Sequence, residues 1–426
     1  MNREPCPGGP PAIAAHFMWK PRPHFCFPLA AILLLTIPTL AQNDLPTLSS
    51  VTRELKGGES HSYRIVLSSG QFLHALVEQQ GIDLITSVFA PDGKKLSESD
   101  SPNDIWGSEA VLVVAPTAGE YRVDVYSSDK RARAGHYRIQ VVTLREATQV
   151  DKDHVEAQRS FNEGINLSVQ QTATAQQSAM EKFRQAAPRF HAAGDTYREA
   201  LSLSSIATSY RNLNQFRQAL EFYNQTLPLA IAAGDRRLEI VVETNIGGML
   251  DVFGDVGKAL QHQQRAIELA REIGSRGQEA SALSNIGKIY NDLADWQKAL
   301  EFYAQALPVF RAAGLKLNEA LTLNNIGIAY SQTGEQQKAL EYLEQALPLM
   351  RTAGNKINEA YTLLNICRTY RRLNDYKNAL DHCNQARAIQ KETGSNAQAA
   401  ETLDEIGVIY SAQDQPDKAA EYHEQS

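Results

Sequence analysis

A unit of 40 residues is repeated along the C-terminal part of the chain and limits the possible folds more than any other feature. The triplets SIA, NIG, NIG, NIG, NIC and EIG begin at residues 205, 245, 285, 325, 365 and 405. One copy predicts a first helix over residues 318–331, a turn over 332–335 and a second helix over 336–352. Gly354 follows, and glycine is typical of the left-handed residue that ends a helix. A repeat of this length indicates helical hairpins stacked around a continuous core.

Small residues recur at fixed places in both helices of the unit. In the first helix they are Gly247, Gly287, Gly327 and Gly407. In the second helix they include Ala259, Ala299, Ala339 and Ala379. Small side chains allow two helix axes to approach closely. Tyrosines three residues after the first small position are predicted to fill the adjoining space, and they include Tyr290, Tyr330, Tyr370 and Tyr410.

The pattern L-x-x-L-x-N-I-G-x-x-Y followed by A-x3-Y-x2-A resembles the tetratricopeptide repeat, with Gly327, Tyr330, Ala339 and Ala346 at its packing positions. The resemblance covers residues 153–426 and implies an all-α solenoid of about six to seven helical hairpins, the last incomplete at its end. The family unit is usually about 34 residues long. A unit of 40 residues therefore implies longer helices, as in kinesin-light-chain-like repeats.

The first helices of such a stack line a concave wall that suits an extended peptide or a partner helix. The resemblance implies that an Asn before Ile-Gly, or before Ile-Cys in the copy at 365, lines this groove and can bind a peptide main chain, as expected for Asn245, Asn285, Asn325 and Asn365. The alternative is that these residues only tie one helix to the next repeat. Neighbouring side chains are expected to set specificity: Lys288, Ile328, Arg368, Arg371 and Arg372. The arginines suit a carboxylate, although a solvated face explains them equally well.

Residues 43–146 show a different pattern, in which apolar and polar residues alternate along short runs. This period predicts a small antiparallel β-sandwich of about eight strands. The segments PDG at 91–93, GEYRVDV at 119–125 and GHYRIQV at 135–141 resemble the pre-peptidase C-terminal type module of secreted bacterial proteins. That resemblance implies a jelly-roll-like fold, and relatives of such modules sometimes bind calcium or glycans. The loop at 99–104 carries oxygen ligands, but a solvated polar loop explains it as well.

The first 41 residues are typical of a secretory signal peptide. An apolar run of 13 residues at 25–37 follows Lys20 and Arg22 and precedes a small-residue site that ends at Ala41. The run is too short to span a bilayer, which needs roughly 18 or more apolar residues, so we expect cleavage and no membrane span in the mature chain. The basic residues after Met18 indicate a possible translation start there. A secreted or periplasmic protein is therefore predicted.

Composition argues against several other classes of function. The chain has 42 Lys and Arg against 49 Asp and Glu, a net charge of -7 without long basic runs, which argues against nucleic-acid binding. The four cysteines form no C-x-x-C pair, and we predict neither a metal nor another cofactor. No phosphate loop, G-x-S-x-G or H-E-x-x-H motif occurs, so no catalytic residue is predicted. Cys367 and Cys383 fit core positions, and they fit an intra-repeat disulfide if the compartment is oxidising.

Together these patterns favour a secreted, non-enzymatic scaffold that binds a protein or peptide in the groove of its repeats. An alternative follows from a second resemblance, because a signal peptide, a jelly-roll-like module and 40-residue repeats are similar to the N-terminal part of bacterial proteins that end in a CHAT domain, a caspase-like cysteine peptidase. The chain is then the recognition fragment of a longer protein with its catalytic domain beyond residue 426. A third hypothesis makes the β domain a module for glycan or surface attachment. The sequence leaves the oligomeric state open.

Overall fold

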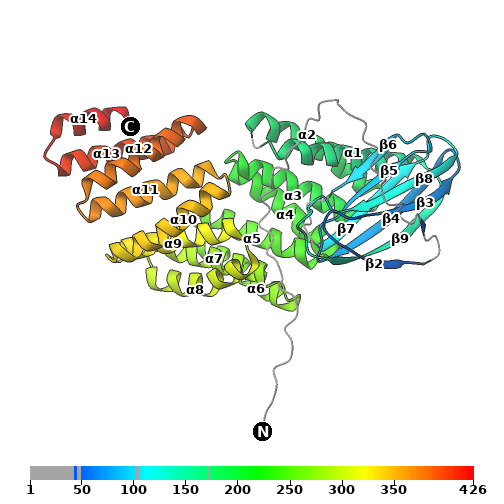
Figure 1. Ribbon diagram of the computed structural model, residues 1–426, viewed down its shortest axis with the longest axis horizontal. Coiled ribbons are helices and arrows are strands. Elements are labelled where there is room, and N and C mark those ends of the chain that lie inside the picture. Colours follow the sequence, from blue (N-terminus) through cyan, green and yellow to red (C-terminus); the bar gives the residue numbers. More distant parts are fainter. Residues whose placement is uncertain (1–42, 46–48, 101–105, 171) are drawn as a thin grey trace, which may run out of the picture. The chain divides into compact units, whose positions relative to one another are not determined.

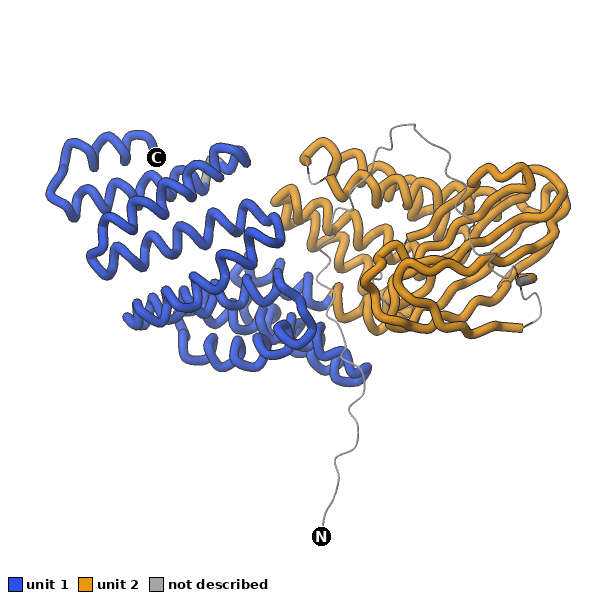
Figure 2. The backbone as a smooth tube through the Cα atoms, viewed as in Figure 1, with its two compact units in different colours: residues 1–16, 243–426 blue, residues 17–242 orange. Residues whose placement is uncertain are grey.

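The computed structural model describes residues 43–45, 49–100, 106–170 and 172–426 (Figure 1). Strands occupy the N-terminal part of these residues and helices the rest. The described residues divide into two compact units, one that ends at residue 242 and one of residues 243–426 (Figure 2). The division falls inside helix α5 (Arg236–Val252), so the β domain and the first helices share one unit. The predicted signal peptide lies outside the described residues.

Nine strands in the described part of the first unit form two sheets. They are β1 (Asn43–Asp44), β2 (Val51–Leu55), β3 (Ser60–Leu67), β4 (Gln71–Gln80), β5 (Ile85–Phe89), β6 (Lys95–Ser99), β7 (Trp106–Val114), β8 (Gly119–Tyr126) and β9 (Gly135–Glu146). The strand orders are β1-β3-β8-β5-β6 and β2-β9-β4-β7. The predicted antiparallel β region is therefore confirmed, apart from the short β1, which pairs parallel with β3. The jelly-roll-like topology stays a prediction.

Alternation along the strands gives this region its core. Leu73 and Val77 of β4 lie in one buried cluster with Tyr121 and Val123 of β8, so one face of each sheet contributes to the same core. On the opposite face of the β4 sheet, Phe72, Ala110 and Leu112 form a second buried cluster, against which Val155 packs. A helix therefore covers the outer side of this sheet.

A buried polar cluster lies where β4 meets the first helices. The rings of His74 and His154 are 5.9 Å apart, and His154 Nε2 lies 3.0 Å from Asp195 Oδ2. Arg198 donates to the same oxygen from Nη1 at 2.9 Å, and it is only 3% exposed. Burial and then the charge of Arg198 lower the pKa of His74 to about 4. His74 is therefore uncharged in the folded protein at neutral pH.

Fourteen helices follow among the described residues. They are α1 (Gln149–Ser168), α2 (Ala173–Ala192), α3 (Thr196–Asn212), α4 (Phe216–Ala232), α5, α6 (Val256–Glu272), α7 (Arg276–Asp292), α8 (Trp296–Ala313), α9 (Lys316–Gln332), α10 (Gln336–Thr352), α11 (Lys356–Arg372), α12 (Tyr376–Thr393), α13 (Asn396–Ala412) and α14 (Pro416–Gln425). The predicted helices at 318–331 and 336–352 correspond to α9 and α10. The predicted order of a β region followed by a helical solenoid is confirmed.

Left-handed residues follow both helices of each unit. After the second helix the residue is a glycine, as predicted for Gly354, which has a φ of 67°. The turn between the two helices also uses a left-handed residue, at positions 214, 254, 294, 334, 374 and 414. Ala294 takes this conformation with a φ of 59°, although it is neither a glycine nor an Asn or Asp, the residues that usually adopt it. Its Cβ clashes with the following carbonyl oxygen in that region, at a cost of roughly 1–2 kcal/mol.

The two helices of a unit approach closely at the predicted small residues. A Cβ added to Gly287 would lie 2.6 Å from Cε1 of Tyr303, and one added to Gly327 would lie 2.6 Å from Cγ of Leu343. Similar contacts arise at Gly247 and Gly407, and the facing alanines are fully buried: Ala259, Ala299, Ala339 and Ala379. The tyrosines instead stack on rings of the second helix, with centroids 5.4–5.6 Å apart: Tyr290 on Phe302, Tyr330 on Tyr342, Tyr370 on His382 and Tyr410 on Tyr422.

Candidate functional site

The first helices of successive repeats form one wall of the second unit. Helix α9 contacts α7 and α11, and α11 contacts α13, more closely than the second helices α8, α10, α12 and α14 contact one another. The inner wall of a curved stack is the shorter one, so these first helices line the concave side. We call the polar and charged side chains of this wall, together with Ile328, the A-helix face: Asn285, Lys288, Asp292, Asn325, Ile328, Tyr361, Arg368, Arg371, Arg372, Glu401 and Glu405.

Hydrogen bonds join neighbouring helices along this wall. Asn365 donates from Nδ2 to Oδ1 of Asn324 at 3.1 Å, which links α11 to α9. Asn291 donates to the carbonyl oxygen of Asn325 at 3.2 Å, which links α7 to α9. Each bond joins residues about one repeat apart, so it fixes the position of one helical hairpin on the next.

The four predicted asparagines differ in their surroundings. Asn365 is only 6% exposed, so the alternative that this residue ties neighbouring repeats together describes it best. Asn285 is half-buried, with Nδ2 3.4 Å from Oε1 of Gln263. Asn325 is half-buried, and its Oδ1 lies 3.5 Å from Nδ2 of Asn324. Asn245 is also half-buried and has a partner within the chain. Peptide contact by these residues stays a prediction.

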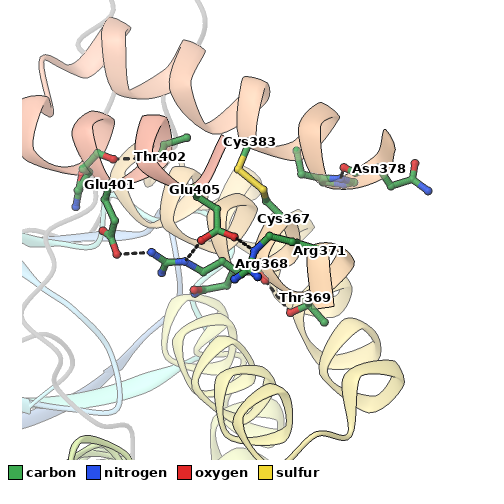
Figure 3. Close-up of a disulfide and its surroundings, with 12 residues drawn as sticks. Cys367, Arg368, Thr369, Arg371, Asn378, Cys383, Glu401, Thr402 and Glu405 are labelled. Atoms are coloured by element: carbon green, nitrogen blue, oxygen red, sulfur yellow. Dashed lines mark hydrogen bonds and ion pairs between the residues drawn. A yellow bond between two sulfur atoms is a disulfide. The ribbon is translucent and has the colours of Figure 1, made fainter. Parts of the chain in front are cut away.

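Two of the three predicted arginines already form ion pairs with carboxylates of this chain. Arg368 donates from Nη2 to Glu401 at 2.6 Å and from Nε to Glu405 at 3.4 Å (Figure 3). Arg371 forms an ion pair with Glu405, whose side chain is only 9% exposed. Glu405 occupies the asparagine position in the last copy, which is the signal that sequence reasoning missed. A ligand carboxylate at Arg371 must therefore compete with a buried partner.

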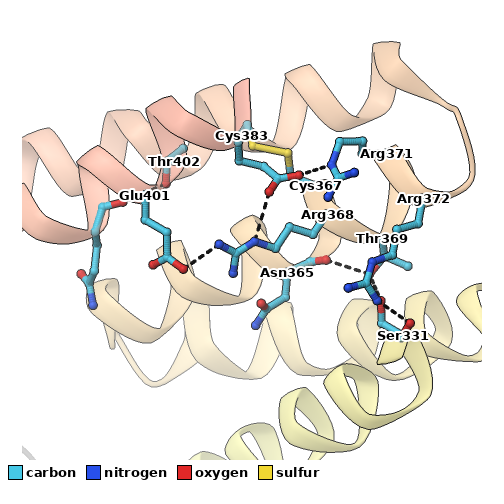
Figure 4. Close-up of polar contacts among 12 residues, drawn as sticks. Ser331, Asn365, Cys367, Arg368, Thr369, Arg371, Arg372, Cys383, Glu401 and Thr402 are labelled. Carbon is cyan, nitrogen blue, oxygen red and sulfur yellow. Dashed lines mark hydrogen bonds and ion pairs between the residues drawn. A yellow bond between two sulfur atoms is a disulfide. The ribbon is translucent and has the colours of Figure 1, made fainter. Parts of the chain in front are cut away.

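Arg372 makes a different contact from the other two arginines. Its Nη1 donates to Oγ of Ser331 at 3.0 Å (Figure 4). Its Nη2 donates to Oε1 of Gln332 at 3.0 Å. Both acceptors are neutral and belong to α9. Arg372 therefore links α11 to the preceding repeat, and its guanidinium does not contact solvent only.

Lys288 and Tyr361 define the middle of the A-helix face. Lys288 donates to Asp251 at 2.7 Å and to Asp292 at 2.6 Å. Burial alone would lower the pKa of Lys288, but these hydrogen bonds outweigh it and raise that pKa. Tyr361 of α11 interacts electrostatically with Lys288 and Asp292 of α7, two repeats away along the chain. Tyr361 was not among the site residues predicted from the sequence. The predicted residue Ile328 of α9 is half-buried.

A disulfide joins the two helices of one repeat. Cys367 and Cys383 are bonded with Cα atoms 5.4 Å apart, and both side chains are fully buried (Figure 3). Cys367 occupies the glycine position of α11 and Cys383 the position of Tyr303 in an earlier copy. The bond therefore replaces the glycine–tyrosine contact seen at Gly287, and the possibility of a disulfide that the sequence left open is realised.

Neither a metal cluster nor a spanning helix is found in the part of the chain that the structure describes. No group of three His, Cys, Asp or Glu residues there is placed to hold a metal ion. No helix among the described residues is both long and apolar enough to cross a bilayer. The loop at 99–104, for which calcium binding was the alternative to a solvated polar loop, lies mostly outside the described residues.

The geometry agrees with comparisons to known proteins. Residues 238–312, 278–352 and 358–426 match the family model of the tetratricopeptide repeat. The helical array therefore contains tetratricopeptide repeats, as the sequence predicts. No curated protein matches the sequence.

Several solved structures share the fold of the array. Aspartyl phosphate phosphatase F from Bacillus subtilis is 17% identical, with a TM-score of 0.52 over 64% of this chain and 70% of that chain. A Rap protein complexed with competence and sporulation factor is 18% identical, with a TM-score of 0.52 over 64% and 74%. The Rap conjugation gene regulator of plasmid pLS20, in complex with the Phr* peptide, is 12% identical, with a TM-score of 0.51 over 65% and 73%. At these identities the likeness shows the fold alone.

Proposed function

We propose that residues 243–426 bind an extended segment of a partner protein or peptide along the A-helix face, and that the chain is a scaffold without catalytic activity. The observation that carries the proposal is the composition of the inner wall, where Asn285 and Asn325 remain half-buried beside exposed charged groups. Half-buried amides suit the main chain of an extended peptide, which offers both donors and acceptors. Lys288 and Ile328 then supply side-chain selectivity.

Two structures of the same fold support this proposal by what they hold. One is a Rap protein in complex with competence and sporulation factor, and the other is a Rap regulator in complex with the Phr* peptide. Peptide binding by this chain is our proposal, because its resemblance to these proteins lies in the fold.

Selection from a displayed peptide library on the immobilised full chain tests the proposal. We expect peptides to be enriched on the natural protein and lost on the double variant Asn285→Ala, Asn325→Ala. The matched control, Glu301→Ala with Glu341→Ala, changes two exposed residues of second helices and should retain binding. Thermal unfolding of each variant checks that the repeats still fold. Absence of enrichment, or equal enrichment on the Asn variant and the control, would overturn the proposal.

We also propose that the protein is secreted. The apolar run before Ala41 supports this, and so does a disulfide between two buried cysteines, since such bonds persist in oxidising compartments. N-terminal sequencing of the native protein tests it. A mature terminus near Gln42 is expected, and a chain that retains residues 18–41 would contradict it. The CHAT-linked and glycan-attachment alternatives stay predictions.

A further inference from the structure

Tyr361 lies on the A-helix face with an unused hydroxyl. The residue is half-buried, and its hydroxyl forms no hydrogen bond with any residue that the structure describes. Burial and then the charge of Glu401 raise the pKa of this hydroxyl, so it remains protonated at neutral pH. Tyr361 therefore offers a ligand an aromatic ring and a hydroxyl that donates to no described neighbour.

Two ion-pair clusters flank this tyrosine. On one side Lys288 of α7 pairs with Asp251 and Asp292. On the other side Arg368 of α11 pairs with Glu401 and Glu405, and Arg371 also pairs with Glu405. The hydroxyl of Tyr361 interacts electrostatically with Lys288 and Asp292 of the first cluster. It also interacts with Arg368 and Glu401 of the second cluster. Tyr361 is therefore within electrostatic range of both clusters.

The two clusters leave their outer carboxylates exposed. Asp292 is 57% exposed and Glu401 is 46% exposed, whereas the inner partners Asp251 and Glu405 are only 8% and 9% exposed. Lys288 is shared between Asp251 and Asp292, so that cluster keeps an excess negative charge, whereas in the other cluster Arg371 also pairs with Glu405 and the charges balance. Arg368 is only 28% exposed and is therefore a poorer site for a ligand anion.

The charge of the whole unit has the same sign as these outer carboxylates. Residues 243–426 contain 18 Lys and Arg against 24 Asp and Glu, a net charge of -6. A field of this sign attracts cationic segments and slows the approach of anionic ones.

We propose that the segment bound by the A-helix face is basic, with a Lys or Arg side chain at Tyr361 between Asp292 of α7 and Glu401 of α13. This inference rests on the proposed function and names the partner's chemistry. The ring of Tyr361 accepts the cation against its face, and the outer carboxylates accept its N–H groups. The inner pairs, Lys288 with Asp251 and Arg368 with Glu405, hold the outer carboxylates in place.

Fluorescence anisotropy with three labelled peptides tests the proposal on the full chain. The peptides have the same Ala-rich sequence and differ only in carrying Lys, Gln or Glu at the same positions. We expect the Lys peptide to bind roughly tenfold more tightly than the Gln peptide at low salt, with the preference falling as salt is added, and the Glu peptide to bind most weakly. Equal binding of all three peptides, or tightest binding of the Glu peptide, would overturn the proposal.

Matched variants locate the site. Asp292→Asn with Glu401→Gln removes two negative charges at Tyr361, and Glu301→Gln with Glu341→Gln removes the same charge from exposed second-helix positions. The first pair should weaken the Lys peptide roughly tenfold and the second should change it little. An equal loss in both pairs contradicts the site, because it indicates net charge alone. Tyr361→Phe keeps the ring and removes the hydroxyl, and we expect a smaller loss.

The outcomes separate this inference from the proposed function. If the library selection yields ligands that need Asn285 and Asn325 but carry no basic residue, the groove binds peptides and the basic preference is wrong. If neither the library nor the labelled peptides bind, both proposals fail.

Discussion

Reduction of the Cys367–Cys383 disulfide should markedly destabilise the last repeats. The bond closes a short loop, with a sequence separation of 16 residues, and both side chains are fully buried. In the chain-entropy description a loop of about this length stabilises the folded state by about 3 kcal/mol, since it limits the unfolded chain. For a cooperative unit of the size of residues 243–426, this corresponds to a fall of roughly 6–12 °C in the unfolding midpoint.

The measurement is thermal and urea unfolding followed by circular dichroism, with the oxidised and reduced proteins compared. Cys6 and Cys26 are replaced by Ser in every sample, so that only the pair in the repeats can respond. The double variant Cys367→Ala, Cys383→Ala is the control, because reductant should leave its stability unchanged. Identical midpoints for the oxidised and reduced proteins, or free thiols at both positions after air oxidation, would refute the reasoning.

Three further experiments test the packing, the backbone strain and the buried histidine. Gly327→Ala should lower the free energy of unfolding by about 1–3 kcal/mol, because its Cβ would lie 2.6 Å from a leucine side chain. Gly257→Ala, with nothing within 4 Å of its Cβ, should raise the free energy of unfolding by about 0.5–1 kcal/mol, and urea unfolding measures both changes. Ala294→Gly should stabilise by about 0.5–1 kcal/mol because it relieves a φ of 59°, and an unchanged midpoint would contradict this. Acid should destabilise the first unit, because burial lowers the pKa of His74 to about 4 while the unfolded chain takes up its proton below about 6.5. That stability is present above pH 6.5 and falls by up to about 3 kcal/mol by pH 4, and His74→Gln should flatten this dependence in unfolding measured at several pH values.

Sequence reasoning succeeded where one residue type had to recur at one place. The close contact at Gly327 and the left-handed Gly354 follow from local geometry, which every 40-residue copy repeats. It failed where a contact joins residues of different copies. The pairing of Arg371 with Glu405 depends on how α13 packs against α11, and no periodicity within one copy specifies that contact. The cluster around His74 of β4 was also missed, since its other members lie on α1 and at the start of α3, far along the chain.

Binding specificity can arise from the positions at which successive copies carry different residues. An array places equivalent residues of successive copies in equivalent surroundings, so a position that packing requires keeps its residue type, as the buried alanines do. At the A-helix position held by Lys288, the following copies carry Ile328 and Arg368, so packing does not dictate that side chain. Such varied side chains define one binding surface only if neighbouring repeats keep a fixed register. The hydrogen bond between Asn365 and Asn324 supports that register, and a preorganised wall lowers the entropy lost when an extended segment binds.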